Sequence, residues 1–489
     1  AVTLDVTALL DRAVDALNAG ALEHAEALAR AAVSQDPDHA AARNTLAWCL
    51  IQGRAFAAAA EEAAAAVMLD PALAPAHNHL GLALNAIGRR EGAVEAFGEA
   101  LRLAPRDLTY GLNLANALEA LGRLDEALLH LDATRRVHPA ATAVYLVRAD
   151  VLQKLQRYPE ALDCYETAID LAPDDPMAHW WYSLCLLLTG RHAEGWREFE
   201  WRLKGSRLGP PQRPRPMPQW QGEDLKGRSI LVHAEQGFGD AIQFARYVPL
   251  LQKTGAEVVV EAYPPLVELF ATLAGSPTVV ATGQPFPAVD FHCPFMSLPF
   301  ALLADQPDIP ADTPYLSVPP AAAARWGTRF DPVGGPLVGL VCSGRPTHPN
   351  DANRSMSLDV LAQALPPGPR YVLLQQELRE ADAEVLNQRP DIICLKDELR
   401  DFSDTAAACS HMDLVISVDT SVAHLAGALG CPLLLLLPFQ PEWRWGLGSD
   451  TCPWYPTARL LRQSAFGDWS DPLASVTAAV SVLLQGDSA

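Results

Sequence analysis

Hydrophobic positions in residues 1–203 recur with a period of 34 residues, and each period holds two stretches of helical spacing. Five alanines share one place in the period and five prolines another: Ala25, Ala59, Ala93, Ala127 and Ala161; Pro37, Pro71, Pro105, Pro139 and Pro173. A small residue lets paired helices approach closely, and a proline ends the second helix. We therefore expect helix pairs that begin near Val6, Ala40, Ala74, Leu108 and Thr142, with a divergent sixth unit over Pro176–Leu203.

From Ser229 onward the pattern changes to short apolar runs that alternate with helices, which is typical of parallel sheets. The strands expected in a first half are Ser229–His233, Glu257–Ala262, Thr278–Ala281 and Val289–Cys293. Those expected in a second half are Leu337–Cys342, Tyr371–Gln375, Ile392–Leu395, Leu414–Val418 and Leu433–Leu437. The helices expected between them are Asp240–Lys253, Pro265–Ala274, Phe402–His411 and Val422–Leu429.

These patterns divide the chain into a helical solenoid and a two-part α/β region. Residues 1–203 form the repeat array and 204–219 a linker rich in proline, which cannot continue a helix and favours an extended spacer. Residues 220–320 form the first α/β half and 321–489 the second, with Ala304–Pro320 as the crossover. Two sheets in this order place a cleft between the carboxyl ends of their strands, where small ligands bind.

The net charge of −21 excludes some partners. Neither half of the chain is basic, so we expect no binding to nucleic acid or to an anionic membrane surface. The nine cysteines form no Cys-x-x-Cys pair, which argues against a zinc knuckle or disulfide framework and fits a reducing cytoplasm. The longest aliphatic run, Leu433–Leu437, is too short for a membrane span, and no signal peptide is visible. We expect a cytoplasmic protein.

A glycine-rich turn follows the first expected strand of the α/β region. Gly237 and Gly239 allow positive φ angles and a close approach of a ligand to the backbone, and Asp240 stands where an N-cap would. Such a turn at a strand end makes a ligand crevice. On these residues alone, an ordinary capped turn without a ligand is an equally good interpretation.

Three stretches of the second half should face the same cleft. Ser343, Arg345 and Arg354 lie in a loop after a strand, where arginines and hydroxyls suit phosphate oxygens, although a solvated polar loop is the alternative. Gln375, at the end of the next strand, could read the edge of a base or ribose.

The third stretch is Asp419-Thr420-Ser421, at the start of a helix that also carries His424. Asp, Thr and Ser side chains satisfy some amides at a helix start, and the amides left free favour an anionic diphosphate. His424 lies one turn further along, so it contacts either the ligand or only the core.

Four tryptophans in the sixth unit and a second aromatic group near the end of the chain complete the pattern. We expect the first group, Trp180, Trp181, Trp196 and Trp201, to pack the last repeat against the next domain. For the second group, Trp443, Trp445, Trp454 and Tyr455, a border of the ligand site and core packing both remain open.

The 34-residue pattern resembles the tetratricopeptide repeat. That resemblance implies a curved solenoid whose concave groove holds a peptide or protein segment, with scaffolding or oligomerisation as the alternative. The pairing of Gly237-Phe-Gly-Asp240 with Asp419-Thr-Ser-Val-Ala-His424 resembles the heptosyltransferase-type glycosyltransferases, which implies the GT-B fold of two Rossmann halves. The layout of repeats followed by this module is similar to bacterial protein glycosyltransferases, including those that modify flagellin, and more loosely to O-GlcNAc transferases.

The resemblance implies an enzyme that moves a sugar from a nucleotide-sugar donor to Ser or Thr hydroxyls of a protein held by the repeats, flagellin being one candidate. Asp240 would be the general base, and Arg345 would neutralise phosphate where the family commonly has a lysine a few residues later. The residues expected to bind the nucleotide sugar are Gly237, Gly239, Gln243, Ser343, Arg345, Arg354, Gln375, Asp419, Thr420, Ser421 and His424.

No cofactor and no metal are expected, because the α/β region lacks an Asp-x-Asp triplet and the charge on the leaving phosphate would be met by Arg345, Arg354, His424 and helix amides. Two alternatives stay open. In one, the acceptor is a saccharide or a lipopolysaccharide core, and in the other the chain is a catalytically silent adaptor that binds partners.

Overall fold

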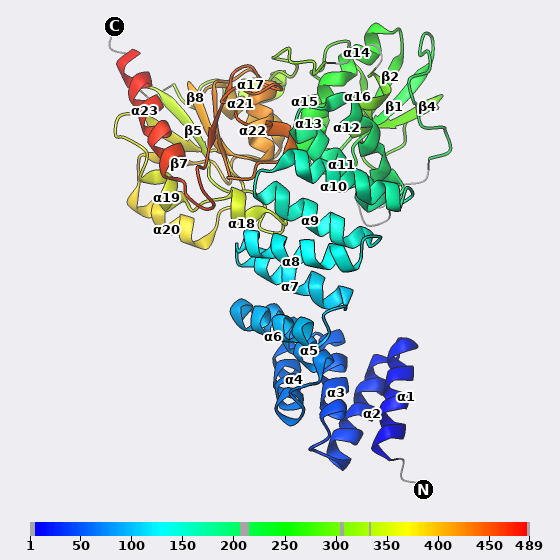
Figure 1. Ribbon diagram of the computed structural model, residues 1–489. Coiled ribbons are helices and arrows are strands. Elements are labelled where there is room, and N and C mark those ends of the chain that lie inside the picture. The colour runs from blue at the N-terminus through cyan, green and yellow to red at the C-terminus, as the bar shows by residue number, and fades with distance from the viewer. Residues whose placement is uncertain (1–4, 206–214, 304–307, 332–333, 487–489) are drawn as a thin grey trace. The chain divides into compact units, whose positions relative to one another are not determined.

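A computed structural model describes residues 5–205, 215–303, 308–331 and 334–486. Contacts between residues divide the chain into two compact units, residues 1–178 and 179–489 (Figure 1). The expected fold class is confirmed, because helical repeats are followed by two parallel sheets with interleaved helices, an arrangement consistent with GT-B. The boundaries expected at 203, 219 and 320 stay predictions.

The helical unit has the predicted repeat. Its helices are α1 (Val6–Asn18), α2 (Leu22–Gln35), α3 (Ala40–Gln52), α4 (Phe56–Leu69), α5 (Ala74–Ala86), α6 (Arg90–Leu103), α7 (Leu108–Ala120), α8 (Leu124–Val137), α9 (Thr142–Lys154) and α10 (Tyr158–Leu171). The first helix of every pair begins at the residue expected for it. The five repeated alanines have no exposed surface, which confirms the close approach of paired helices.

The turns inside the repeats share a left-handed backbone. The residues with positive φ at this place in the period are Gly20, Arg54, Gly88, Gly122, Gln156 and Gly190. Glycine adopts this conformation without steric cost, whereas Arg54 and Gln156 carry a Cβ atom that strains it. The turn is therefore fixed by the geometry of the repeat and not by glycine alone.

The α/β unit contains two parallel sheets. The first consists of β1 (Ser229–His233), β2 (Glu257–Ala262), β3 (Thr278–Ala281) and β4 (Phe291–Pro294), in the order β3-β2-β1-β4. The second consists of β5 (Leu337–Val341), β6 (Arg370–Leu373), β7 (Ile392–Cys394), β8 (Leu414–Val418), β9 (Leu433–Leu437) and β10 (Ala458–Arg462), in the order β10-β9-β8-β5-β6-β7. All nine expected strands are present, and the sequence reading missed β10.

The helices of this unit are shorter and more broken than expected. They are α11 (Pro176–Leu188), α12 (His192–Phe199), η1 (Glu200–Leu203), α13 (Phe238–Phe244), η2 (Ala245–Tyr247), α14 (Val248–Lys253), η3 (Pro264–Leu266), α15 (Val267–Phe270), η4 (Phe295–Ser297), α16 (Leu298–Ala301), α17 (Pro320–Trp326), α18 (Asp351–Arg354), α19 (Leu358–Ala362), α20 (Glu380–Gln388), α21 (Phe402–Ser410), α22 (Ser421–Ala428), η5 (Trp443–Trp445) and α23 (Ser470–Gly486). The single helix predicted over Asp240–Lys253 is wrong. It breaks at η2 because Pro249 has no N–H to continue the helical bonding.

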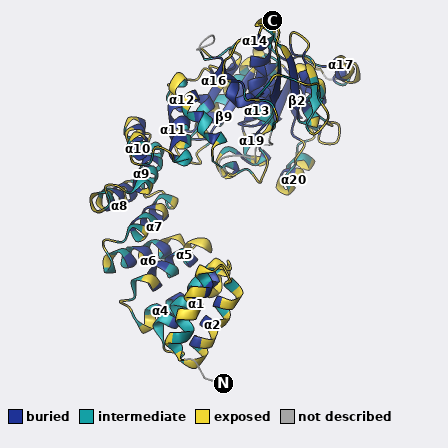
Figure 2. Ribbon diagram, turned by 90° about the vertical axis from the view of Figure 1, so that its right-hand side faces the viewer, coloured by how far each residue is buried: buried dark blue, intermediate teal, exposed yellow. Residues whose placement is uncertain are grey.

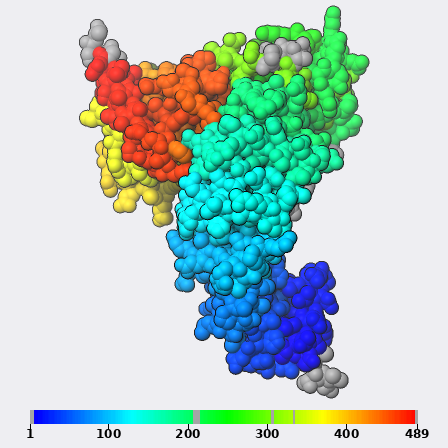
Figure 3. All heavy atoms as spheres, in the orientation of Figure 1, coloured from blue at the N-terminus to red at the C-terminus, as the bar shows by residue number. Residues whose placement is uncertain are grey.

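A shared hydrophobic core joins the two halves of the α/β unit. Helix α13 of the first half packs along α22 of the second, and Figure 3 shows the atoms of the two halves in contact over the face that is visible. Figure 2 shows the buried residues concentrated in this unit's strands and helices. Arg246 also crosses the boundary, since its Nη1 donates to the carbonyl oxygen of Trp454 in the second half at 2.7 Å.

The predicted packing of the sixth unit's tryptophans against the next domain is confirmed in part. Trp196 is buried and meets Phe244, Trp443 and Trp454 edge-on, so it does pack the last repeat helix against the α/β halves. Trp181, by contrast, is exposed.

The connecting segments fall partly outside the described residues, which omit Pro210, Pro211 and Pro214 of the linker and residues 304–307 of the crossover. The end of the linker runs along β4, since His292 N donates to Pro218 O at 3.0 Å. The crossover reaches the second half where Tyr315 N donates to Ala428 O at 3.1 Å. No helix within the described ranges has the length and apolar character needed to span a bilayer.

Candidate functional site

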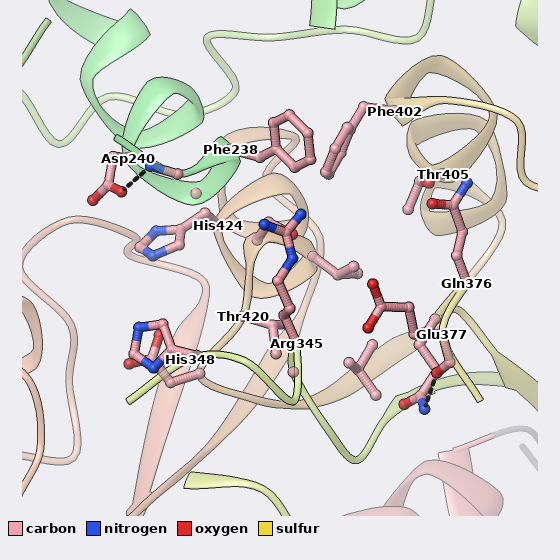
Figure 4. A pocket seen from close by; sticks show the side chains of 18 of the residues that line it. Phe238, Asp240, Arg345, His348, Gln376, Glu377, Phe402, Thr405, Thr420 and His424 are labelled. Atoms are coloured by element: carbon pink, nitrogen blue, oxygen red, sulfur yellow. Dashed lines mark hydrogen bonds between the residues drawn. The ribbon is translucent and has the colours of Figure 1, made fainter. Parts of the chain in front are cut away.

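A cavity of about 740 Å³ lies between the two α/β halves. One wall comes from the segments after β1 and β2, and the other from those after β5, β6 and β8, so the cavity opens where the parallel strands end (Figure 4). Its size is within the range of ligand pockets. The predicted position of the cleft, at the carboxyl ends of both sheets, is confirmed.

The glycine turn lines this cavity, but for different reasons than expected. Gly237 has φ −70°, and neither it nor Gly239 has a positive φ. A Cβ atom on Gly239 would lie 2.9 Å from the ring of His424, so Gly239 is required for the close contact between α13 and α22. The prediction of positive φ is therefore wrong, and the glycine serves helix packing.

Asp240 is not the N-cap of its helix, and that prediction is also wrong. The cap is Gly237, and Asp240 lies three residues further on, where its Oδ2 accepts the N–H of Gly237 at 2.9 Å. A carboxylate at this position satisfies an amide that the helix leaves free. This bond holds the carboxylate at the edge of the cavity.

Arg444 holds the other oxygen of Asp240. Its Nη2 donates to Asp240 Oδ1, its Nη1 to Glu442, and its Nε to Gln243 Oε1 at 2.7 Å. Burial raises the pKa of Asp240 above its usual value, while the charge of Arg444 acts in the opposite direction. The cavity wall thus carries a cluster of one buried guanidinium and two partly buried carboxylates.

Two arginines on the opposite wall have no anionic partner. Among the described residues, the side chains of Arg345 and Arg354 form no ion pair or hydrogen bond, and Nε of Arg354 is buried without an acceptor. The guanidinium of Arg354 lies against Gly344, where a Cβ atom would come within 2.7 Å of Nη2. Figure 4 shows the side chain of Arg345 extending through the middle of the cavity. Positive charge is therefore available to an anionic ligand.

The start of α22 adds hydrogen-bond donors to this wall. Thr420 is its N-cap and makes no side-chain capping bond, so the first amides of the eight-residue helix keep their donors. The expectation that side chains would cap this helix is not met. Asp419 is buried beside it, and burial raises its pKa to about 6.

His424 is fixed in the core and faces the cavity. Its Nδ1 lies 2.9 Å from the hydroxyl of Tyr455, its ring stacks on Trp445, and burial lowers its pKa well below the usual value. The imidazole is therefore neutral, so the positive charge expected from it is not available. Trp445, Trp454 and Tyr455 are buried, which settles core packing for these three aromatic residues.

Three further residues expected to bind the nucleotide sugar form hydrogen bonds with other residues of the protein. Gln375 and Ser343 line the cavity, but the amide of Gln375 bonds to Cys342 N, Ser343 Oγ and Glu377 O. Gln243 is fully buried, accepts from Arg444 and does not line the cavity. The amide proposed to read a base is thus occupied, whereas Gly237, Gly239, Asp419, Thr420 and Ser421 line the cavity as expected.

The sequence reading gave no site role to several residues that line the cavity. Phe238 and Phe402 meet across the two halves with ring centres 5.2 Å apart (Figure 4). Tyr263 packs edge-on against Phe238. Glu442 and Arg444 also line the cavity. For Arg444, the neighbouring tryptophans were the one available signal, because its partners Gln243 and Asp240 lie about 200 residues away in the chain.

Within the residues that the structure describes, no group of three or more His, Cys, Asp or Glu side chains is placed to hold a metal ion. The expectation of a metal-independent reaction stays a prediction.

Comparison with known proteins identifies the repeats. A tetratricopeptide repeat family model matches residues 10–78, 78–143 and 146–198. The structure of a thermophilic TPR protein of Thermus thermophilus, TTC0263, is 23% identical and covers 37% of this chain and 100% of that chain, with a TM-score of 0.33. A structure from the functional characterisation of Pseudomonas aeruginosa pilF is 22% identical and covers 42% and 91%, with a TM-score of 0.36.

One curated relative extends beyond the repeats. Protein FlbA of Caulobacter vibrioides is 28% identical over 322 residues, which is 60% of this chain and 53% of the relative. The chain therefore spans about half the length of this relative. Because 60% of 489 residues exceeds the 203 residues of the expected array, the likeness reaches into the α/β region. The chain thus carries tetratricopeptide repeats over residues 10–198, followed by an α/β region, and is distantly similar to FlbA.

Proposed function

We propose that the chain is a glycosyltransferase that moves a sugar from a nucleotide-diphosphate donor to a hydroxyl of a protein recruited by the repeats. The observation that carries the proposal is the division of charge in the cavity. The second half contributes two arginines without an ion-pair partner among the described residues and a helix N-terminus, and the first half contributes the carboxylate of Asp240. A departing diphosphate and an acceptor hydroxyl need these two environments.

On the donor side, Arg345, Arg354 and the first amides of α22 would bind the diphosphate. Charge-assisted bonds from guanidinium groups and helix amides stabilise the negative charge that grows as the sugar leaves. Nε2 of neutral His424 would donate a hydrogen bond to the ligand or accept one from it, without adding charge. Acidic residues outnumber basic ones in this chain, whose net charge is −21, yet these two arginines form no ion pair among the described residues.

On the acceptor side, Asp240 would be the general base. The hydroxyl oxygen forms a bond to the anomeric carbon, the bond from that carbon to the phosphate oxygen breaks, and the diphosphate leaves with the electron pair. The hydroxyl proton passes to Asp240. Burial raises the pKa of this carboxyl, which increases its basicity, and Arg444 keeps it ionised and oriented.

The repeats support a protein acceptor, since tetratricopeptide solenoids present an extended concave surface that suits a polypeptide. Flagellin is one candidate, on the resemblance to repeat-containing protein glycosyltransferases. A saccharide acceptor remains the alternative substrate within the same chemistry.

The ion pair between Asp240 and Arg444 favours one competing function, a nucleotide-binding adaptor without catalysis, in which the carboxylate only braces the cavity. Asp240→Asn in the full chain separates the two. The variant keeps the shape and removes the base, so we expect transfer to fall by about 100-fold or more while nucleotide affinity, measured by calorimetry, stays within about twofold. Transfer at the wild-type rate would exclude Asp240 as the base, and binding without any transfer in the wild type would favour the adaptor.

A further inference from the structure

A buried ion pair joins the end of the repeat array to the first sheet. The side chains of Arg202, in η1, and Glu235, after β1, are 1% and 4% exposed. Nη2 and Nε of Arg202 donate to the two oxygens of Glu235 at 2.7 and 3.1 Å. The other arm of the guanidinium bonds to Glu200 at 2.8 Å, and Ser297 accepts a further bond at 2.7 Å. Such a two-pronged pair fixes the orientation of both partners.

Glu235 stands at the base of the turn that carries Asp240. It is separated from Gly237 by one residue, and its Oε1 also accepts the N–H of Met296 at 3.2 Å. The next carbonyl along, that of Gln236, accepts a hydrogen bond from Tyr263. The entrance to the turn is therefore anchored by buried bonds, and within the described chain the guanidinium that bonds to Glu235 is that of Arg202.

The same short segment also contacts residues of the second half that lie beside Arg444. Trp196 meets Phe244 and Trp443 at ring-centre distances of 5.9 and 5.4 Å, and Phe199 meets Trp443 at 6.1 Å. The guanidinium of Arg444 lies over the ring of Trp443, 4.5 Å from its centre. Trp443 thus packs between the last repeat helix and the arginine that holds Asp240.

We propose that Arg202 is a positioning residue and that residues 192–203, although largely matched by the repeat family, form a working part of the site in the α/β unit. Arg202 fixes the Asp240 turn through Glu235, and Trp196 and Phe199 fix Arg444 through Trp443. Neither Arg202 nor Trp196 lines the cavity, so both act through other residues. The catalytic consequence rests on the function proposed above, whereas the effect on the turn does not.

A purely structural role makes a different prediction. Two apolar residues of similar size often replace a buried ion pair without loss of stability, whereas removal of one partner leaves an uncompensated charge. The double variant Arg202→Met/Glu235→Met therefore separates folding from positioning, because it restores a compatible core but lacks the directional bonds.

The test uses the full chain in three forms: R202M, R202M/E235M and a control. We expect R202M to lower the unfolding temperature and the double variant to regain most of it. In the double variant, amide hydrogen exchange at residues 236–240 should be about 10-fold faster, and kcat for transfer should fall by about 10- to 100-fold with the donor KM unchanged.

The control is R215M/E261M, which removes another buried ion pair, between the linker and β2, with side chains 9% and 4% exposed. It should leave exchange at residues 236–240 and kcat at wild-type values. A double variant R202M/E235M with wild-type exchange in this turn would overturn the proposal, whatever the enzyme's chemistry. Faster exchange in the turn of a protein without transferase activity would instead leave the positioning role standing and remove the proposed function.

Discussion

The two compact units solve the same problem of burying apolar surface in opposite ways. In the repeat unit, contacts are made with the next helix or the next repeat, and the core is largely alanine, with five of these residues fully buried at one place in the period. In the α/β unit, the core holds large aromatic residues, and buried charges are paired across as many as 204 residues. Stability in the first is a sum of local terms, and in the second it depends on distant parts of the chain.

The boundary between these two regimes does not coincide with the end of the repeat pattern. The family model matches residues up to 198, whereas the compact α/β unit begins at residue 179. Helix α12 therefore has the sequence of a repeat and the contacts of the α/β core. The sequence of this helix matches the repeat family, whereas its packing places it in the α/β unit.

Truncation tests this comparison with the largest expected effect. A chain that begins at Pro173 keeps α12 and should unfold cooperatively and retain nucleotide binding. A chain that begins at Lys204 loses Trp196, Phe199 and Arg202, which leaves Glu235 buried and unpaired, and should lose roughly 6 kcal/mol or more of stability. Circular dichroism and chemical denaturation measure the difference. Equal stability of the two shortened chains would place the boundary at 203 after all.

The unpaired charges of the cavity give the next largest effect. Replacement of both Arg345 and Arg354 by methionine should weaken nucleoside-diphosphate binding by at least about 100-fold, because each charge-assisted phosphate contact contributes on the order of 1.5–3 kcal/mol. The matched control replaces the exposed Arg30 and Arg102 of the repeat unit, which pair with neighbouring glutamates on their own helices. Isothermal titration calorimetry should find no change in the control. Unaltered affinity in the first variant would remove the phosphate site.

Two glycine substitutions compare packing in the units directly. Gly239→Ala places a Cβ atom 2.9 Å from the His424 ring and should cost about 1–3 kcal/mol. Gly98→Ala, inside helix α6, meets nothing within 4 Å and should stabilise the protein by about 0.5–1 kcal/mol. Denaturation curves of both variants provide the measurement. If both substitutions changed the free energy of unfolding in the same direction, the inferred difference in packing around Gly239 and Gly98 would be wrong.

The dependence of stability on pH should differ in sign between the units. Burial raises the pKa of Asp419 from 3.8 to about 6, so between these pH values the folded protein holds a proton that the unfolded chain has released. Stability from this group therefore falls as pH rises through that window, and Asp419→Asn should add on the order of 1–2 kcal/mol at pH 7.

Exposed carboxylates of the repeat unit behave in the opposite way. Arg123 and Arg157 lower the pKa of Glu126 and Glu160, so the stabilisation from these pairs is present at neutral pH and is lost as pH falls. Unfolding followed at pH 4, 5, 6 and 7 in D419N and in the wild type isolates the contribution of the buried group. Parallel pH profiles for the two proteins would show that Asp419 titrates normally.

The sequence predicted the repeats almost residue by residue because their determinants are local. Prolines and alanines at fixed spacing set the helix boundaries, and apolar runs set nine strands of the sheets. Strand β10 was missed because Arg459 and Arg462 interrupt its apolar pattern, and its pairing partner β9 supplies the context that the sequence lacks.

The candidate site was less predictable for a related reason. The position of Asp240 could be foreseen from its glycine turn, but its bond to Arg444 depends on how two halves of the chain meet. Likewise, the role of Gly239 follows from the ring of His424, which lies 185 positions later, and not from its own φ angle. Patterns in one stretch of sequence cannot encode such contacts.

The guanidinium of Arg246 has a consequence for how molecules enter and leave the cavity. Its nitrogens donate hydrogen bonds to the backbone oxygens of Gln243, Pro310 and Trp454, and it lies against the rings of Tyr315 and Tyr455. To swing the halves apart as a hinge would break the bond to Trp454 O and the contact with Tyr455, both in the second half, without a replacement partner for the buried cation. We therefore expect ligand exchange to take place over the exposed rim around Arg345 to Thr347, through side-chain movement alone and at a fixed separation of the two halves.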